Sequence, residues 1–139
     1  MADTVREVMT TKPSTVEASA TVQEAAQLMD REDIGAVLVV ENGNVQGIVT
    51  DRDIAVRAVA KGSDPSQTSV REVCTTGLET LSPDDTIDDA VKKVRSSDIR
   101  RLPVVDGGKP VGVVSLGDLA VARDPDSALA DISAASPNN

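Results

Sequence analysis

The feature that most constrains the fold is an internal duplication at a constant offset of 65 residues. The run VREV at residues 5–8 recurs at 70–73, and GIVTDRD at 47–53 is matched in type by GVVSLGD at 112–118. No gap is needed anywhere between Val5 and Val121. A period this long, present in two copies, is not typical of solenoid repeats. Each half alone would bury too little core, so we expect two related halves packed sheet to sheet about a pseudo-twofold axis.

Within each half the apolar pattern predicts the order strand, helix, strand, strand, helix, which is an α+β fold. A capping box at residues 21–24 opens the first helix, whose apolar residues have the spacing of one buried stripe: Val22, Ala25, Ala26 and Met29. The run at 36–40 is continuously apolar, which indicates a strand buried on both faces. Asn42 and Gly43 predict the hairpin turn to a return strand at 45–49. A second helix is expected from Asp51 to a glycine stop at Gly62.

Each half also carries a hydroxyl residue followed three places later by an aspartate, where a strand ends and a helix begins. The pairs are Thr50 with Asp53 and Ser115 with Asp118. A carboxylate in the first helical turn can accept from both hydroxyls of a ribose, and the hydroxyl and free N–H groups beside it can meet a phosphate. The same spacing is also an ordinary capping box. Its occurrence twice in one frame favours a ligand-binding corner in each half.

Composition excludes several classes of function. The 139 residues carry a formal charge of −9, which argues against nucleic acid or an anionic membrane as the main partner. There is no histidine, no aromatic residue and one cysteine, so the commonest general base, a base-stacking platform and a thiolate metal cluster are all missing. We therefore do not expect an enzyme. No run is long and apolar enough to span a bilayer, and no secretory signal is visible, so we expect a cytoplasmic protein.

Three further features have a functional and a structural interpretation. Adjacent arginines at residues 100–101 suit phosphate contact, or surface ion pairs of little energetic weight. Cys74 could be a redox sensor, but its counterpart is the apolar Met9, which favours a small buried hydrophobe. The aspartates at 84–85 and 88–89 could hold Mg²⁺, but their place at a helix start favours an interaction with the helix dipole.

Together these blocks resemble those of a cystathionine-β-synthase (CBS) domain. In the first half they are VREVMT (5–10), TVQEAA (21–26), IGA (34–36) and GIVTDRDI (47–54); in the second, IRRLPVVD (99–106) is similar to the second-strand block. The resemblance covers Val5 to about Arg123 as a tandem pair, the unit called a Bateman module. It implies one CBS domain at residues 1–65 and another at 66–124. The tail at 125–139 is expected to form a short helix and then fray.

The resemblance implies a non-catalytic regulatory module. Such a module senses an adenosine-containing ligand, of the AMP, ADP, ATP, S-adenosylmethionine or NAD type, in the cleft between two CBS domains and signals to a partner protein. Mg²⁺ is expected only together with a polyphosphate, and a homodimer is expected because modules of this family commonly pair. The alternative is a structural or interaction dimer whose ligand binding has been lost.

Carried over residue by residue, the resemblance implies ligand contacts at both corners, at the start of the second strand and in the segment before the first strand. These positions are Thr50, Arg52, Asp53, Ser115 and Asp118; Ala36, Val37, Arg100, Arg101 and Leu102; and Thr15 and Thr80. The first half has Leu38 where the family often has proline. In the second half Leu116 and Gly117 replace the Asp51–Arg52 pair, so the two sites are not expected to be equivalent.

Overall fold

A computed structural model describes residues 4–96 and 101–123, and packing divides the chain into two compact units. Of the described residues, the central unit comprises 14–78, and the split unit comprises those up to 13 and from 79 onward. The unit boundaries therefore differ from the sequence repeats, because each repeat's leading segment packs with the other repeat's sheet. The predicted tail lies outside the described residues.

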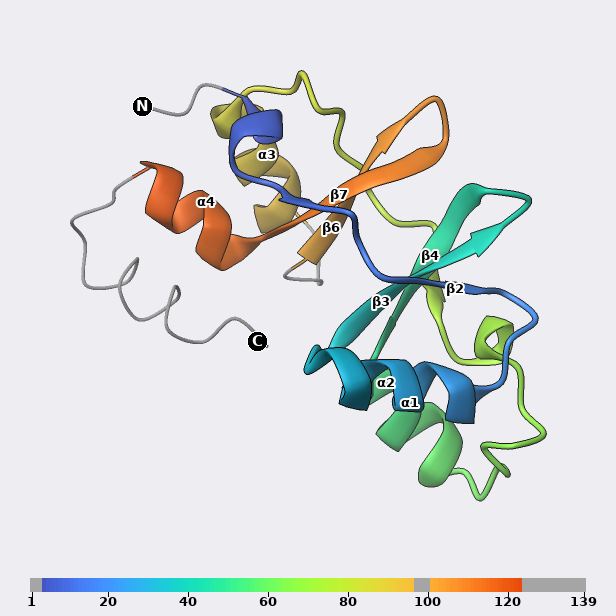
Figure 1. The fold of residues 1–139 in the computed structure, drawn as a ribbon. Helices are drawn as coiled ribbons and strands as arrows, with labels where there is room; N and C mark the ends of the chain where they lie inside the picture. The colour runs from blue at the N-terminus through green and yellow to red at the C-terminus, as the bar shows by residue number, and fades with distance from the viewer. Residues whose placement is uncertain (1–3, 97–100, 124–139) are drawn as a thin grey trace. The chain divides into compact units, whose positions relative to one another are not determined.

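The central unit is a mixed four-stranded sheet covered on one face by helices (Figure 1). Its strand order is β2-β3-β4-β5, where β2 is parallel to β3 and the other pairs are antiparallel. The elements are β2 (Thr15–Glu17), α1 (Val22–Glu32), β3 (Ala36–Glu41), β4 (Asn44–Thr50), α2 (Asp51–Asp53), the π-helix η2 (Ile54–Val59), the 3₁₀ helix η3 (Val70–Glu72) and β5 (Thr75–Thr76).

The split unit repeats this plan with a three-stranded antiparallel sheet of order β1-β7-β6. Its elements are the 3₁₀ helix η1 (Val5–Glu7), β1 (Thr10–Thr11), α3 (Ile87–Arg95), β6 (Arg101–Asp106), β7 (Lys109–Ser115) and α4 (Leu116–Arg123). A single bridge between Leu81 and Val104 stands where the central unit has β2. The predicted α+β class and the repeated strand–helix–strand–strand–helix order are thus confirmed, with the first strand of the second copy reduced to this bridge.

Local sequence signals account for the helix starts and the hairpins. The Thr21 hydroxyl accepts a hydrogen bond from the Glu24 N–H, and the Thr86 hydroxyl does the same for Asp89, so both long helices begin with the expected cap. Asn42 and Gly43 have φ of 54° and 81°, the left-handed pair that a two-residue hairpin turn requires. Register shifts at Val39/Val40 and Val104/Val105 put the same bulge into both hairpins.

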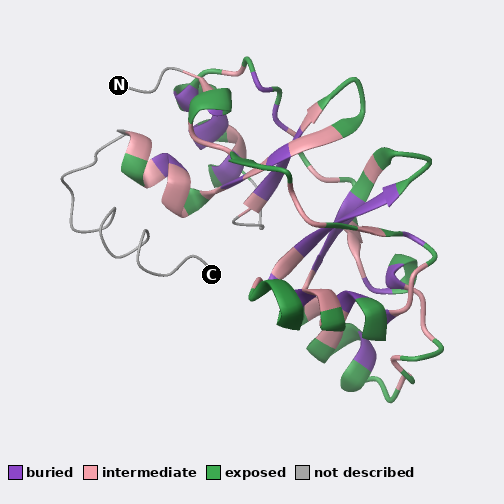
Figure 2. Ribbon diagram, in the orientation of Figure 1, coloured by how far each residue is buried: buried purple, intermediate pink, exposed green. Residues whose placement is uncertain are grey.

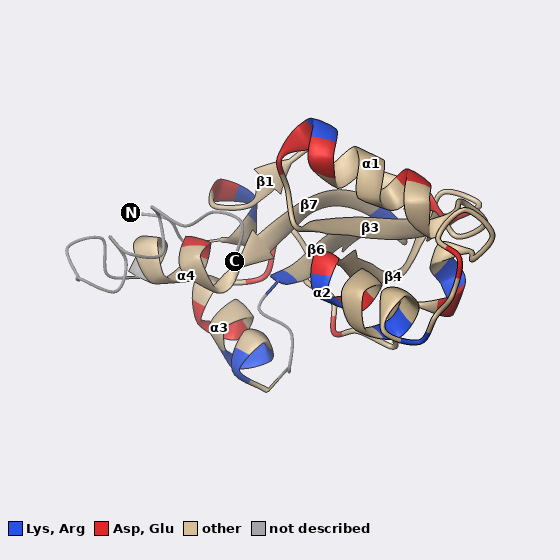
Figure 3. Ribbon diagram, turned by 90° about the horizontal axis from the view of Figure 1, so that it is seen from below, with Lys and Arg blue, Asp and Glu red and all other residues tan. Residues whose placement is uncertain are grey.

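Each unit has its own core, visible as the buried parts of strands and helices in Figure 2. Val22, Ala25 and Met29 of α1 are buried as the stripe predicted, while Ala26 is only partly so. Val37 to Val40 are all buried, which confirms the interpretation of the continuous run in β3. Charged residues lie on helices, on connections and at strand ends, and the middles of the strands carry none (Figure 3).

The helix expected from Asp51 to Gly62 has a different form. After one α-helical turn, the Ala60 and Ser63 N–H groups donate to carbonyls five residues back, at 2.8 and 3.0 Å. Val59, the last residue of this π-helix, is 61% exposed.

Candidate functional site

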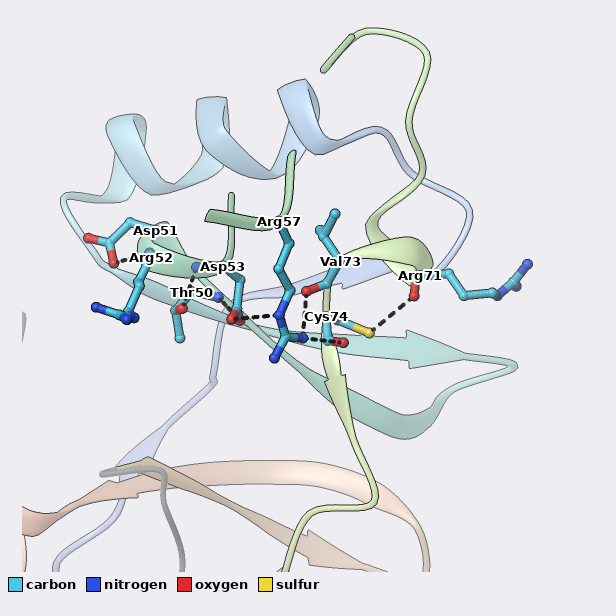
Figure 4. Close-up of polar contacts among 8 residues, drawn as sticks. All are labelled: Thr50, Asp51, Arg52, Asp53, Arg57, Arg71, Val73 and Cys74. Atoms are coloured by element: carbon cyan, nitrogen blue, oxygen red, sulfur yellow. Dashed lines mark hydrogen bonds and ion pairs between the residues drawn. The ribbon is translucent and has the colours of Figure 1, made fainter. Parts of the chain in front are cut away.

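The first corner is formed where β4 ends and α2 begins (Figure 4). The Asp53 N–H donates to Thr50 Oγ1, and the Thr50 N–H donates to Asp53 Oδ2, both at 3.0 Å. These reciprocal bonds make a complete capping box, so the structural interpretation of the motif is correct. The bonds also fix the carboxylate at the end of the strand, with only 14% of the Asp53 side chain exposed.

The second oxygen of Asp53 faces a cation that the motif did not include. Arg57 lies one turn later, with its Nε 3.8 Å from Asp53 Oδ1. Its Nη1 donates to the carbonyls of Val73 and Cys74 at 3.1 and 3.2 Å. Figure 4 shows the guanidinium between the carboxylate and these two carbonyls. The i, i+4 spacing from Asp53 was visible in the sequence, but the two carbonyls, 16 and 17 residues away, were not.

The second corner repeats the cap without the cation. The Ser115 N–H donates to Asp118 Oδ2 at 2.9 Å, and the Asp118 N–H donates to Ser115 Oγ at 3.1 Å. The residue that corresponds to Arg57 is Ala122. Among the described residues no ion pair involves Asp118. The two corners therefore share their backbone geometry and differ in the charge beside the carboxylate.

The strand register brings the predicted second-strand residues to these corners. Ala36 pairs with Thr50, and Arg101 pairs with Ser115 at the matching place. Val37 and Leu102 follow one residue later, but they are only 1% and 0% exposed because both belong to the unit cores. Ala36 and Arg101 are half-buried beside the two corners, and their contact with a ligand stays a prediction, whereas the side chains of Val37 and Leu102 are taken up by core packing.

The remaining candidates are more scattered. Thr15 is exposed at the start of β2, where it pairs with Leu38 of β3. Thr80 is half-buried, and its carbonyl accepts a hydrogen bond from Lys93 Nζ at 3.1 Å. Arg52 is exposed on α2 next to the first corner. Arg100 lies outside the described residues.

Cys74 is half-buried and packs against the central core, as its apolar counterpart Met9 led us to expect. Burial raises the pKa of its thiol, and the negative charge of Asp53 adds to that effect, while Arg57 and Arg71 oppose it. A thiol that resists deprotonation is a poor redox centre.

The described residues offer neither a metal cluster nor a membrane-spanning helix. They contain no group of three or more His, Cys, Asp or Glu side chains placed to share a metal ion. None of the helices within 4–96 and 101–123 combines the length and apolarity needed to cross a membrane.

Comparison with known proteins gives consistent matches. The profile of the CBS domain family matches residues 5–59 and 70–124. The chain is 48% identical over 117 residues to CBS domain-containing protein YhcV of Bacillus subtilis, covering 84% of this chain and 83% of the relative.

Solved structures agree. One, of a putative signal-transduction protein with CBS domains from Burkholderia ambifaria, superposes with a TM-score of 0.77 at 34% identity, covering 89% of this chain and 96% of that one. A hexameric CBS-CP12 protein from bloom-forming cyanobacteria superposes with a TM-score of 0.76 at 28% identity, covering 91% and 74%.

Proposed function

Because the chain belongs to the CBS domain family, with one domain in each repeat, we propose that it binds an adenosine-containing ligand at its Asp53 and Asp118 corners and signals occupancy to a partner protein. Tandem CBS domain proteins are generally regulatory and ligand-binding. The observation that carries the proposal is the doubled corner: two aspartates in matching capping geometry at the ends of strands with matching register.

The capping bonds are compatible with ribose binding. A carboxylate offers about four lone-pair sites on its two oxygens, and the cap uses one of them. The sites that remain can accept from two vicinal hydroxyls, while the cap holds the group against rotation. Ala36 leaves room beside the first corner, and Arg101 supplies a cation beside the second. An acidic chain with few arginines near these corners favours a monophosphate, or a polyphosphate that arrives with Mg²⁺.

The test is isothermal titration calorimetry of the purified chain with AMP, ADP, ATP with and without Mg²⁺, NAD and S-adenosylmethionine. Asp53→Asn and Asp118→Asn are the variants of choice, because asparagine keeps one oxygen to accept the capping N–H and loses the charge. We expect each to weaken binding at its own corner by about tenfold or more, the effect of removing a charge-assisted hydrogen bond. Circular dichroism of each variant controls for folding.

The outcomes separate the candidate functions. Binding that survives the double variant unchanged would refute the ribose assignment. No binding of any of these compounds would favour the interaction protein that has lost its ligand. Chromatography of the nucleotide after long incubation tests the non-catalytic role, which requires that the nucleotide is recovered unchanged.

Self-association belongs to the same proposal. Four large apolar residues are exposed on η2 and α4, namely Val56, Val59, Leu116 and Val121, and Val56 and Val121 occupy equivalent positions in the two repeats. We propose that they contribute to a homodimer; that CBS proteins can self-associate is supported by a structural relative, which is hexameric. Sedimentation equilibrium checks this: Val56→Asp and Val121→Asp together should shift the chain to the monomer mass.

A further inference from the structure

The Asp53 corner is tied to a distant part of the chain by one side chain. Arg57 Nη1 donates to the carbonyls of Val73 and Cys74, and its Nε lies 3.8 Å from Asp53 Oδ1. The two carbonyls stand immediately before β5, which pairs with β4 at Ile48 and Gly47. A single guanidinium therefore touches both the carboxylate assigned to ribose and the segment that completes the sheet (Figure 4).

The distances indicate which partner fixes the position of the Arg57 guanidinium. Both hydrogens of Nη1 are used by backbone carbonyls, at 3.1 and 3.2 Å, so the plane of the guanidinium is set by the main chain. The contact with Asp53 is longer, at 3.8 Å, and is an ion pair rather than a hydrogen bond. Arg57 is thus held by residues 73–74 and presents a positive charge to Asp53 from a defined position.

The second corner has the cap and lacks the link. Ala122 stands where the first repeat has Arg57, and α4 is a regular α-helix where the first repeat has the π-helix η2. The second corner can therefore serve as an internal control, because it has the same cap but Ala122 in place of Arg57.

We propose that Arg57 is a positioning residue of the first corner: it holds the Asp53 carboxylate from the side opposite the cap and couples it to residues 73–76. The coupling runs both ways, because a group that draws Asp53 away from Arg57 weakens the same guanidinium's hold on Val73 and Cys74. The ligand that would draw on Asp53 rests on the proposed function, whereas the link itself does not.

The link is tested without ligand by hydrogen exchange and mass spectrometry of peptides covering residues 73–76. Arg57→Met keeps an unbranched apolar stem that reaches as far as Nε and removes every donor. We expect exchange there to rise about threefold or more, since two charge-assisted bonds to the backbone are lost. Asp53→Asn should raise it about twofold, as expected for an i, i+4 ion pair, and should add nothing in the Arg57→Met background. Asp118→Asn is the matched control and should leave these peptides unchanged.

A merely structural arginine would give a different pattern. If Asp53→Asn leaves exchange at 73–76 unchanged, or has the same effect with and without Arg57, the coupling is refuted. Arg57→Lys sharpens the result, because a lysine keeps the charge but cannot bridge two carbonyls and a carboxylate at once. We expect hydrogen exchange at residues 73–76 to be as fast in Arg57→Lys as in Arg57→Met.

The consequence for binding is tested with AMP as the probe, in backgrounds that isolate each corner. In Asp118→Asn protein, where the first corner remains, Arg57→Met should weaken AMP binding about twofold or more, as for residues in one network. In Asp53→Asn protein, where the second corner remains, it should change nothing. Equal loss in both backgrounds, or no loss in the first, would refute the positioning role.

The two proposals fail in distinguishable ways. If AMP affinity depends on Asp53 but not on Arg57, the proposed function stands and the positioning role falls. If AMP affinity depends on neither aspartate, the proposed function falls, and the exchange measurements alone decide whether Arg57 couples Asp53 to residues 73–76.

Discussion

Gly47→Ala is expected to open the pairing between β4 and β5, the contact that holds the leading segment of the second repeat on the central sheet. A Cβ at this buried glycine would lie 2.3 Å from the Thr75 carbonyl oxygen and 3.1 Å from its carbon. Ordinary contacts begin near 3.4 Å, so about an ångström must be gained by moving backbone. Overpacking of this kind costs about 1–3 kcal/mol, and the upper part of that range applies because the obstacle is main chain rather than a flexible side chain.

Urea unfolding followed by far-ultraviolet circular dichroism suits this chain, which has no aromatic fluorescence. Two matched glycines separate the clash from other effects. At Gly107, φ is +60° and a Cβ would meet nothing within 4 Å, so Gly107→Ala reports backbone strain alone, about 1 kcal/mol. At Gly112 the nearest atom, 2.7 Å away, is Met9 Sδ, which can move, and the Thr10 carbonyl at 2.9 Å is less crowded than its counterpart. We therefore expect Gly47→Ala to be the most destabilising of the three. If Gly47→Ala unfolds at a urea concentration equal to or higher than that of Gly112→Ala, the reasoning is refuted.

Three further outcomes are expected. Thr50→Ala removes the hydroxyl that accepts from the Asp53 N–H and should lower the free energy of unfolding by about 1 kcal/mol in the same urea assay; an unchanged midpoint would contradict the cap. The Cys74 thiol, whose pKa is raised first by burial and then by Asp53, should react with a disulfide reagent only at higher pH than a free thiol, and Asp53→Asn should shift that profile to lower pH. Since the folded pKa is the raised one, the thiol's contribution to stability is present at neutral pH and is lost as pH rises through the folded pKa. Leu102→Ala empties a site that is 0% exposed and should cost about 2–5 kcal/mol, measured by urea unfolding; a loss below 1 kcal/mol would mean that the strand is not core.

The features that followed from the sequence are those set by neighbouring residues. Hydroxyl caps define the starts of α1 and α3, because Thr21 and Thr86 satisfy N–H groups three residues ahead. The Asn42–Gly43 turn follows from residues that tolerate positive φ. The duplication then extended each local signal to the second repeat.

The exchange of leading segments could not be predicted in this way. Strands β1 and β5 are two residues long, and each pairs with a strand of the other repeat, so no local pattern records the pairing. The glycines at 47 and 112 were the available signal, since each marks where another backbone approaches closely. The π-helix was missed for a related reason: its hydrogen-bond spacing is not visible in the apolar pattern.

At the site, the motif predicted the hydroxyl–carboxylate corner but not its surroundings. Successive residues of a strand face opposite sides of the sheet. Val37 and Leu102 are on the side that faces the core of their unit, and the motif alone did not reveal this. Arg57 was overlooked because its significance lies in two carbonyls that the fold brings from 16 and 17 residues away.

The two corners differ most plainly in the charges around their carboxylates. Both keep the reciprocal cap around Asp53 and Asp118, so the proposed ribose acceptor is presented by the same local backbone arrangement twice. In the first corner the described cations, Arg52 and Arg57, come from the helical segment after the carboxylate; in the second, Arg101 comes from the strand paired with it. An anionic ligand anchored by its ribose is attracted toward whichever cation is near. We therefore expect the phosphate of a bound nucleotide to be oriented differently in the two corners, so that Arg101→Met weakens AMP binding in Asp53→Asn protein and spares it in Asp118→Asn protein. Equal weakening in both backgrounds would show that the two corners do not act as separate sites.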